Sequence, residues 1–511
     1  MENLKVKNKP SVVLFEPMYY GKRRMVQRAP LELLAISGLL DKEGYDISII
    51  SRALFEQPIE KVLMKCEGAI CFGITALTGY QITEGLVVSK MVKERYPDLP
   101  IVWGGWHPSL EPEGTLASDY VDIVVRGQGE RTFYELVKLL QEGKDLASLA
   151  GISFKKDNKI IHNPHRELED LNNFPPTPYH LIDVEKVLSN DEYGSRVINY
   201  VSSYGCPNNC SFCAEHLVHK GKWTGLSAQR MLDDFQRLQR DYGIDCVAVN
   251  DTQFFLNKKR VVDFCQGLIQ KNIPLKWDNV EGNIRQLLRW EDDLWDLMTK
   301  SGLSSMLVGS ESGYPEALKL MNKPLTVDET YRFAQKAKAF DIKVLYSMMF
   351  GLPWDKDYKK TGELISKEID MTLKLADKII SLNDKNRVLL CIYTPYPGNP
   401  LYEKSLEIGL EPPKSLEGWG NWNLMKQTTP WISKKQAWFI NFISSYIFFF
   451  LDSTSYDWVT ARVKNKVIRF LFQRVFKIYI RIAHFRWKHK FFSFPIDYWI
   501  YVLGREILKI A

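Results

Sequence analysis

The segment Gly205-Cys206-Pro207-Asn208-Asn209-Cys210-Ser211-Phe212-Cys213 places three cysteines in the spacing C-x3-C-x2-C. It follows residues 197–202, an apolar run with the pattern of a buried strand. Three thiolates this close on one loop can reach three corners of an iron–sulfur cubane, whereas a zinc site needs a fourth ligand that is not evident nearby. Three ligands leave one iron open to chelate amino and carboxylate groups. The spacing therefore predicts a [4Fe-4S] cluster on Cys206, Cys210 and Cys213.

The same strand opens a regular alternation of strands and helices over about 200 residues. The expected strands are six apolar runs separated by helical patterns, at residues 197–202, 246–249, 275–278, 305–309, 344–350 and 389–393. Strands separated by one helix each pair in parallel. Six such units predict a partial (β/α)6 barrel, in which the chemistry lies at the carboxyl ends of the strands.

The first 140 residues show a second alternation of this kind. Strands are expected at residues 12–16, 46–51, 69–74, 101–104 and 123–125, with helices between them. This pattern predicts a doubly wound parallel sheet, which binds ligands outside the carboxyl ends of its strands. The loops at those ends are Thr75-Ala76-Leu77-Thr78, Gly104-Gly105-Trp106-His107-Pro108 and Gly127-Gln128-Gly129-Glu130. Adjacent glycines let a backbone approach a ligand, although glycines that only close tight turns explain any one loop equally well.

Residues 151–195 have the character of a linker. A small hairpin is expected at 152–155 and 159–163, and it is followed by Phe174-Pro175-Pro176-Thr177-Pro178, where proline blocks helix and central strand. We therefore expect an α/β protein in four parts. These are a doubly wound domain at 1–145, a linker at 146–195, the barrel at 196–405 and a mainly helical, basic and aromatic region at 406–511.

The composition narrows the class of protein. The 511 residues include 68 Lys and Arg against 61 Asp and Glu, and the mean hydropathy of −0.22 excludes a disordered or polytopic membrane chain. Eight cysteines are too few for a disulfide scaffold, and the grouping of three indicates a metal in a reducing compartment. We expect no secretory signal, and the longest apolar stretch, 438–451, is too short to span a bilayer. The expected location is cytoplasmic.

The strand-end motifs resemble those of the radical S-adenosylmethionine (SAM) superfamily. Besides the cysteine loop, the resemblance rests on Asn250-Asp251-Thr252-Gln253-Phe254, Gly309-Ser310-Glu311-Ser312-Gly313, Phe350-Gly351-Leu352-Pro353 and the proline- and glycine-containing segment 393–402. The loops at 104–108 and 127–130 resemble the GGxHP and GEGE loops of its cobalamin-binding branch, with Gln128 in place of the usual Glu. Taken together, residues 11–402 resemble the cobalamin-dependent radical SAM enzymes. This family includes class B methylases and the anaerobic Mg-protoporphyrin ester cyclase.

This resemblance implies three cofactors, namely a [4Fe-4S] cluster, SAM and cobalamin. For SAM it suggests polar contacts from Glu311 and Ser312, with Asp251 and Arg285 nearer to the shared cavity, although each could instead form a salt bridge at the barrel rim. No residue is assigned a catalytic role. Candidates for cobalamin binding are the loop residues Thr75, Gly104, Gly105, His107, Gly127, Gly129 and Glu130.

His107 is a candidate for the cobalamin tail, but a histidine that caps the turn before Pro108 explains it equally well. The Asp-x-His-x-x-Gly motif that supplies a histidine to cobalt in methionine-synthase-like domains is absent from the sequence. We therefore expect cobalt to be held without a histidine ligand, as the resemblance to class B enzymes also implies.

The resemblance also implies a reaction. In the methylase version, a 5′-deoxyadenosyl radical abstracts hydrogen from an unactivated carbon and methylcobalamin supplies the methyl group. Two alternatives remain, a non-methylating oxidation or cyclisation of the tetrapyrrole cyclase type, and a cobalamin- or SAM-binding sensor or chaperone without catalysis. The intact cysteine triplet argues against the last. An electron donor of the flavodoxin or ferredoxin type is the implied protein partner.

The tail from 432 to 511 is basic and aromatic, with 14 Lys and Arg, 4 Asp and Glu, and 21 of the 64 aromatic residues. Helical spacing is expected to place a mainly cationic group on one face of a helix, and its members are Lys466, Arg469, Gln473, Arg474, Lys477 and Arg481. It places a second group on the other side, Val467, Phe470, Leu471, Val475, Ile478, Tyr479 and Ile482. Such a helix suits an anionic membrane surface, here its inner face, and suggests a hydrophobic or lipid-like substrate. Packing on the barrel is the alternative, and nucleic-acid binding is disfavoured because no known module is recognisable.

Overall fold

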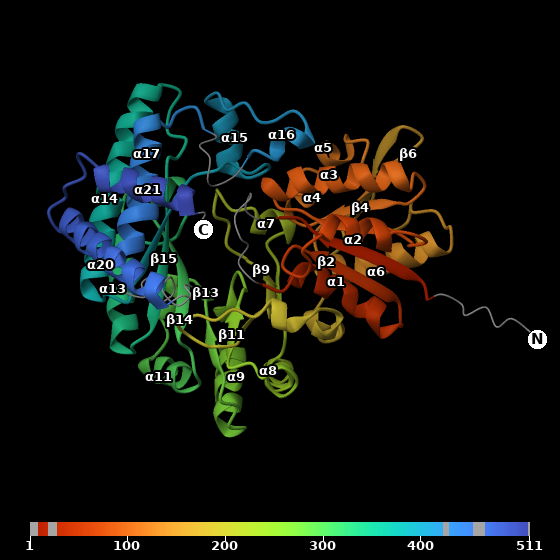
Figure 1. The fold of residues 1–511 in the computed structure, drawn as a ribbon, viewed down its shortest axis with the longest axis horizontal. Coiled ribbons are helices and arrows are strands. Elements are labelled where there is room, and N and C mark those ends of the chain that lie inside the picture. The colour runs from red at the N-terminus through yellow and green to blue at the C-terminus, as the bar shows by residue number, and fades with distance from the viewer. Residues whose placement is uncertain (1–8, 19–27, 423–428, 453–465, 509–511) are drawn as a thin grey trace, which may run out of the picture.

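The computed structural model describes residues 9–18, 28–422, 429–452 and 466–508. A sheet domain formed by the N-terminal part lies beside an open barrel, and the C-terminal helices cover the barrel on its other side (Figure 1). Helices α15 (Pro400–Glu407) and α16 (Leu416–Trp419) run between the barrel and the sheet domain, where α16 contacts the third helix of that domain.

The N-terminal domain is built on a seven-stranded sheet with the order β2-β1-β3-β4-β5-β6-β7. Its first five strands pair in parallel, as the alternation of strands and helices predicted: β1 (Ser11–Glu16), β2 (Asp46–Ser51), β3 (Phe72–Thr75), β4 (Ile101–Gly104) and β5 (Ile123–Val125). The connecting helices are α1 (Leu31–Lys42), α2 (Pro58–Lys65), α3 (Tyr80–Arg95), α4 (Trp106–Leu110), α5 (Pro112–Leu116) and α6 (Gly129–Gln141). Helix α1 packs on α6 and α2 on α3, as expected of a doubly wound sheet.

The hairpin that the sequence analysis assigned to the linker belongs to this sheet instead. Strand β6 (Ile152–Lys156) pairs antiparallel with β5, and β7 (Lys159–His162) pairs antiparallel with β6. Short strands and a tight turn look alike in a linker and at a sheet edge, so local pattern did not reveal the pairing with β5. The sheet therefore continues to His162, beyond the expected boundary at 145. The remaining linker contains three short 3-10 turns, η1 (Leu171–Asn173), η2 (Tyr179–Leu181) and η3 (Val184–Lys186).

The barrel contains the six expected parallel strands in two hydrogen-bonded sheets, β12-β11-β8 and β13-β14-β15-β16. Their bounds are β8 (Val197–Tyr200), β11 (Cys246–Val249), β12 (Lys276–Asp278), β13 (Val280–Gly282), β14 (Ser305–Glu311), β15 (Lys343–Phe350) and β16 (Arg387–Ile392). The expected third strand, 275–278, corresponds to β12, and β13 is an additional strand that the sequence analysis did not predict. The two are separated by Asn279, which has a left-handed φ of 54°. Asparagine tolerates this conformation, so the strand turns here from one sheet to the other.

Helices cover the outside of the barrel, where α8 packs on α9, α9 on α11, α10 on α13 and α13 on α14. They are α8 (Ala228–Tyr242), α9 (Lys258–Gln270), α10 (Ile284–Leu288), α11 (Asp292–Lys300), α12 (Pro315–Leu320), α13 (Val327–Ala339) and α14 (Tyr358–Leu382). Helix α13 begins with a capping box of Thr326 and Glu329, and Asp357 caps α14. A short hairpin, β9 (Ser203–Gly205) with β10 (Trp223–Gly225), frames the cysteine loop, which is followed by α7 (Glu215–Val218). One more 3-10 turn, η4 (Phe254–Leu256), follows β11.

The apolar stretch 438–451 is part of a continuous helical segment that packs on β16. The segment consists of α17 (Lys434–Phe442), a π-helical part η5 (Ile443–Phe448) and α18 (Phe449–Leu451). Its Ser444 hydroxyl donates to the carbonyl of Leu390, 3.3 Å away on β16. In the parts of the chain that the structure describes, no helix combines the length and apolar character required to cross a bilayer.

Two further helices, α20 (Lys466–Lys488) and α21 (Ile496–Leu508), pack on this segment. The apolar group predicted for one face of α20 does not form the buried side of this helix. The buried residues of α20 are Phe476, Ala483, Arg486 and Trp487, whereas Val467, Phe470, Val475 and Ile478 are exposed. Phe470 even lies against Arg474, with the guanidinium 4.9 Å from the ring centre. The predicted positions Lys466 and Leu471 have side chains outside the described residues.

Candidate functional site

The cysteine loop starts at a backbone position that only glycine fits. Gly205 has a φ of 87°, and a Cβ there would lie 1.9 Å from the carbonyl oxygen of Lys222, the residue before β10. Its N–H donates to Glu215 Oε1 at 2.8 Å, so the carboxylate of α7 closes the loop from the other end. Within the loop, the amide of Asn208 lies 3.4 Å from the sulfur of Cys206. The three cysteines therefore leave the sheet on a strand end that is fixed at both sides.

Two distant parts of the barrel hold the middle of this loop. On the β14 side, the backbone N–H of Ser211 donates to Met321 O at 2.9 Å, and the amide of Asn322 donates to Asn209 O at 2.7 Å. On the β16 side, the N–H of Leu401 donates to Ser211 O at 2.9 Å, and the amide of Asn399 donates to Phe212 O at 3.3 Å. The segment that follows the last strand thus has a structural role, which is to clamp the cysteine loop.

The cysteine loop is compatible with a cluster that takes one iron per cysteine. Among the described residues, no three or more His, Cys, Asp or Glu side chains gather closely enough to hold a single metal ion. A cubane needs no such gathering, because each cysteine binds a different iron. Cys206 and Cys210 are buried and Cys213 is half-buried, on a loop fixed at both ends, so the residues fit a [4Fe-4S] cluster.

The other cysteines lie elsewhere. Cys66, Cys71, Cys246 and Cys265 are buried in the two cores, as expected. Cys391 differs, because it is half-buried on β16, and burial together with the charge of Glu311 raises its pKa to about 11. Cys391 therefore lies within electrostatic reach of Glu311.

Glu311 occupies a strained position at the end of β14. Its φ is 57°, and the register between β14 and β15 shifts between Gly309 and Glu311. The absence of a side chain at Gly309 makes room for the carboxylate, because a Cβ there would lie 2.2 Å from Glu311 Oε1. Lys323 Nζ donates to the same oxygen at 2.9 Å, and both side chains are largely buried. Non-glycine residues are held in this backbone region mainly at functional sites.

Lys323 and Glu281 are site residues that the sequence analysis missed. Burial opposes the charge on Lys323, but the charges of Glu311, Cys210 and Glu281 raise its pKa above the ordinary value. Glu281 lies on β13 opposite Leu307 of β14. Burial raises the pKa of Glu281 to about 8, while Lys323 lowers it and Glu311 raises it further. The carboxyl half of the barrel therefore contains Glu311, which is paired with the buried Lys323, and Glu281, which lies within electrostatic reach of both.

Three other residues were predicted to contact SAM. Of these, the structure brings only Asp251 near the buried group of Glu311, Glu281 and Lys323. Asp251 accepts hydrogen bonds from Ser202 N at 2.5 Å and from the hydroxyls of Ser202 and Ser203 at 2.6 Å, and its charge raises the pKa of Glu281. Ser312 instead turns toward α14, where its hydroxyl lies 3.1 Å from that of Thr372.

Arg285 is also placed away from the buried group. It is exposed and paired with Glu329 at the start of α13, 2.9 Å away. Side chains alternate in direction along a strand, and the bulge between Gly309 and Glu311 shifts that alternation, so the motif alone did not reveal where Ser312 points. Arg285 lies on α10, and its pairing with Glu329 follows from the packing of α10 on α13, which the sequence does not show.

The loops after β3 and β4 meet at the carboxyl edge of the N-terminal sheet. A Cβ at Gly105, which has a φ of 95°, would lie 3.0 Å from Thr75 Oγ1 and from Ala76 O. His107 in α4 is fully buried, and its Nδ1 lies 3.0 Å from the hydroxyl of Thr78. Burial lowers the pKa of His107 to about 3, so the ring is neutral at ordinary pH. Its Nε2 is buried and has no hydrogen-bond partner in the described part of the chain, which marks a place for a polar group of a ligand.

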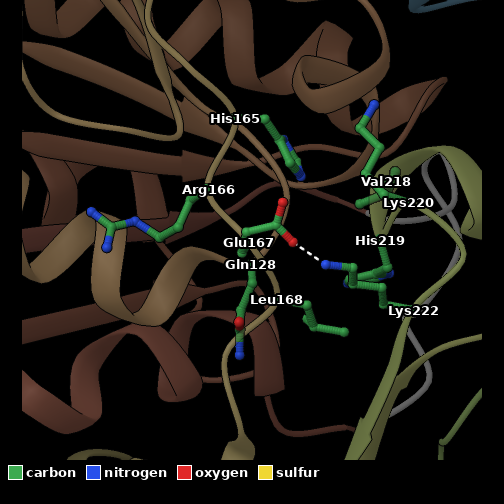
Figure 2. Close-up of a pocket in the computed structure, with 9 residues that line it drawn as sticks. All are labelled: Gln128, His165, Arg166, Glu167, Leu168, Val218, His219, Lys220 and Lys222. Carbon is green, nitrogen blue, oxygen red and sulfur yellow. Dashed lines mark hydrogen bonds and ion pairs between the residues drawn. The ribbon is translucent and has the colours of Figure 1, made fainter.

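The loop after β5 has a different role, because it joins the sheet domain to the linker and the barrel (Figure 2). Gln128 forms two hydrogen bonds with the backbone of Glu169, its Oε1 accepting at 2.7 Å and its Nε2 donating at 3.3 Å. A glutamate could not donate the second bond, which explains the departure from the family pattern. Glu130 is buried and hydrogen-bonds Tyr204 of β9, and burial raises its pKa. Nearby, Glu167 and Lys222 form an ion pair across the pocket drawn in Figure 2.

Aromatic side chains of the segment after α15 cover His107, a contact that the sequence analysis did not predict. The ring centre of Trp419 lies 5.5 Å from that of His107, and Trp422 packs on Trp419. The indole of Trp422 donates to Pro395 O at 2.8 Å, in the loop after β16. The loop after β16 and the edge of the sheet are thereby joined through Trp422, Trp419 and His107.

Two family models match the chain, the B12 binding domain at residues 27–137 and the radical SAM superfamily at residues 200–365. An uncharacterized methyltransferase of Pyrococcus horikoshii, PH0819, is 30% identical over 382 residues, which are 74% of this chain and 78% of that protein. The chain is a cobalamin-dependent radical SAM enzyme.

Two further relatives are less than 30% identical to this chain. The anaerobic magnesium-protoporphyrin IX monomethyl ester cyclase of Synechocystis is 27% identical over 58% of this chain and 59% of its own. The hopanoid C-3 methylase of Methylococcus capsulatus is 23% identical over 75% of this chain and 69% of its own. The solved structure of OxsB with aqua-cobalamin bound has the same fold, with a TM-score of 0.70, 17% identity and coverage of 98% of this chain and 75% of that one.

Membership of this family gives the enzyme its cofactors, which are a [4Fe-4S] cluster, SAM and cobalamin. The residues present fit them, since the fixed cysteine loop suits the cluster and the unpartnered Nε2 of His107 lies at the sheet edge where such domains bind ligands. Radical SAM enzymes also need a reductant.

Proposed function

We propose that this enzyme methylates an unactivated carbon of a hydrophobic or lipid-like substrate. When bound, the cofactors supply a 5′-deoxyadenosyl radical for hydrogen abstraction and a methyl group from cobalamin. The observation that carries the proposal is the position of the clamped cysteine loop between the barrel interior, with Glu311, Glu281 and Lys323, and the carboxyl edge of the cobalamin domain. Both PH0819, an uncharacterized methyltransferase, and the hopanoid C-3 methylase support methyl transfer. The hopanoid C-3 methylase also supports a lipid-like substrate.

The proposed roles follow from the positions of the side chains. Cys206, Cys210 and Cys213 hold the cluster, and Glu311 with Lys323 presents a fixed dipole to SAM in the barrel. Asp251 holds Ser202 and Ser203 in place and thereby positions the start of the cysteine loop. Ser312 and Arg285 are not included, because their polar atoms are engaged away from this group.

For cobalamin, the proposed contacts are Thr75, Gly104, Gly105 and His107 at the ends of β3 and β4. The predicted contacts Gly127 and Glu130 are better explained by contacts to the linker and to β9, because a Cβ at Gly127 would lie 3.3 Å from His165 of the linker and Glu130 hydrogen-bonds Tyr204. Gly129 is better explained by close packing of α6 on α1, because a Cβ there would lie 2.9 Å from Ile36. Trp419 covers His107 and limits the access of water to this edge.

The competing reaction is a radical oxidation or cyclisation without methyl transfer, which the similarity to the Synechocystis cyclase favours. The coproducts distinguish the two. With labelled SAM and a hydrophobic acceptor, methylation should yield one 5′-deoxyadenosine and one S-adenosylhomocysteine for each methyl group transferred. Formation of 5′-deoxyadenosine with product but without S-adenosylhomocysteine would reject the methylase proposal.

Two proposals concern partners. The electron donor is proposed to be a flavodoxin or ferredoxin, which can be tested by replacing a chemical reductant with the purified proteins in the same assay. The enzyme is proposed to be cytoplasmic and to associate with the inner face of the membrane. The support for this association is the excess of cations and aromatic residues after residue 431.

A further inference from the structure

The outward face of α21 is apolar. Ile496, Trp499, Ile500 and Leu503 follow the spacing i, i+3, i+4, i+7, which places them on one face of the helix. Their exposed fractions are 66%, 56%, 58% and 58%. The other side of the helix packs inward through Tyr498 and Tyr501, whose rings lie 5.6 Å and 5.4 Å from that of Tyr446. The apolar side of α21 therefore faces outward, whereas an ordinary surface helix turns its apolar side toward the core.

The turn between α20 and α21 continues this apolar face. Phe491 and Phe494 are exposed, Phe494 to 79%. The turn is held by Arg486, a buried arginine that donates to the carbonyl oxygens of Phe491 at 2.9 Å and of Ser493 and Phe494 at 3.0 Å. The apolar side chains are therefore presented on a fixed backbone and cannot be buried by a simple rearrangement of the turn.

The same arginine fixes the position of α21. Arg486 forms an ion pair with Asp497 in the first turn of α21, and Asp497 also accepts a hydrogen bond from the Tyr446 hydroxyl at 2.5 Å. Burial raises the pKa of Asp497, but the hydrogen bonds from Arg486 and Tyr446 outweigh it and lower that pKa. The carboxylate is thus charged and enclosed, and it contributes little negative charge to the outer surface.

Cations border the apolar face. On the outward side of α20, Arg474, Arg481 and Lys488 are exposed between the exposed side chains of Phe470, Ile478 and Phe485. Asp497 is the one acidic residue among residues 466–504. A second copy of this chain would bring the same positive charge to a symmetric interface, whereas an anionic lipid surface offers acyl chains for the apolar face and negative headgroups for the cations.

We infer that α21 and the turn at residues 491–494 are the element that enters an anionic membrane interface, while the cations of α20 contact the headgroups. This inference rests on the membrane association proposed above and places the inserting face on α21, because its four exposed apolar side chains lie on one face with no Lys or Arg between residues 496 and 503. The Arg486–Asp497 pair holds the inserting helix at a fixed angle to the barrel. Burial of four apolar side chains supplies the larger part of the affinity.

The test is vesicle binding by the full chain. The variant Ile496→Ser/Trp499→Ser/Ile500→Ser/Leu503→Ser should bind vesicles of mixed anionic and neutral phospholipid roughly 100-fold more weakly. The matched control, Met64→Ser/Val87→Ser/Ile269→Ser, changes exposed apolar residues of other helices and should bind as the unchanged protein does. The variant Arg474→Glu/Arg481→Glu/Lys488→Glu should lose the preference for anionic over neutral vesicles.

A second measurement needs no variant. Amide hydrogen exchange of the full chain should slow in residues 491–504 when vesicles are added and stay unchanged in α8 and α9. Equal binding by the four-serine variant, or protection confined to α20, would overturn the inference. A dimer in solution that the four-serine variant dissociates would also overturn it, in favour of a second copy. SAM cleavage with a chemical reductant, measured without vesicles, tests the proposed function separately, and the four-serine variant should retain it.

Discussion

At the scale of single residues, the cluster ligands are the sharpest assignment. The triple variant Cys206→Ala/Cys210→Ala/Cys213→Ala should lack the broad cluster absorbance after anaerobic reconstitution and should cleave no SAM, because no other cysteines have this spacing. Cys265→Ala is the matched control, since this cysteine is fully buried in the barrel core and far from the loop in sequence. Absorbance or SAM cleavage retained by the triple variant would refute the assignment.

The buried pair of Lys323 and Glu311 leads to a second prediction. Lys323→Met leaves Glu311 in a buried site without its cation, which should lower the free energy of unfolding by about 3 kcal/mol. Arg285→Met breaks the exposed pair with Glu329 and should cost less than about 1 kcal/mol. Urea unfolding of both variants checks the difference. An equal decrease in the free energy of unfolding for both variants would show that the buried pair stabilises the protein no more than the exposed pair does.

These residues also show what the sequence could not predict. The cysteines are recognised by spacing along one loop, which is local information. Lys323 reaches Glu311 because the chain after α12 folds back toward the bulge at Gly309, and Glu281 faces the same group because of the register of β13 against β14. Both facts depend on pairing between strands, so a motif search along the chain finds Glu311 but not its partners.

At the scale of elements, helix α14 supports the loop that follows β15. Glu368 of α14 is fully buried, accepts a hydrogen bond from the N–H of Gly351 at 2.8 Å and another from the indole of Trp354. Burial raises the pKa of Glu368 to about 8, against the opposing effect of these donors. The loop 350–353, which the sequence analysis noted as a motif, is therefore held by a carboxyl group from a neighbouring helix.

This raised pKa predicts a pH dependence of stability. An unfolded glutamic acid loses its proton near pH 4.5, whereas folded Glu368 keeps it up to about pH 8. Raising the pH from 5 to 8 should therefore lower the free energy of unfolding of the apoprotein, with Glu368 contributing roughly 2 kcal/mol or more. Glu368→Gln removes that contribution and should give a flatter profile in urea unfolding at pH 5, 6.5 and 8. Identical slopes for the two proteins would contradict the prediction.

The elements themselves were largely predictable. The six expected barrel strands lie within two residues of their predicted limits, because a buried parallel strand between helices has a strong local pattern, whereas the short β13 was not predicted. The errors concern pairing and orientation. The β6–β7 hairpin joins the sheet through β5, and α20 buries Phe476, Ala483 and Trp487 because α18 and η5 happen to pack on that side. Neither partner is visible in the sequence of the element concerned.

At the scale of the whole molecule, the contacts between the two domains lie around the edge where cobalamin is proposed to bind. Gln128 joins the sheet domain to the linker, Glu130 joins it to β9, and Trp419 with Trp422 joins it to the loop after β16. Trp419 contacts His107 in the segment after β4, and Gln128 and Glu130 follow β5, the neighbouring strand of the sheet. The arrangement fixes the sheet edge against the barrel end, which is what a reaction shared between two cofactors requires.

This arrangement also predicts the state of the cobalt. His107 is the one histidine at the ends of β3 and β4, and its ring is enclosed by Trp419 while Nδ1 is engaged by Thr78. We expect its free Nε2 to contact the cofactor tail and the cobalt to have no histidine ligand. Electron paramagnetic resonance of bound cob(II)alamin should therefore show no nitrogen superhyperfine splitting, both in the unchanged protein and in His107→Ala, although His107→Ala should bind cobalamin more weakly. Splitting in the unchanged protein that disappears in His107→Ala would mean that this histidine binds cobalt.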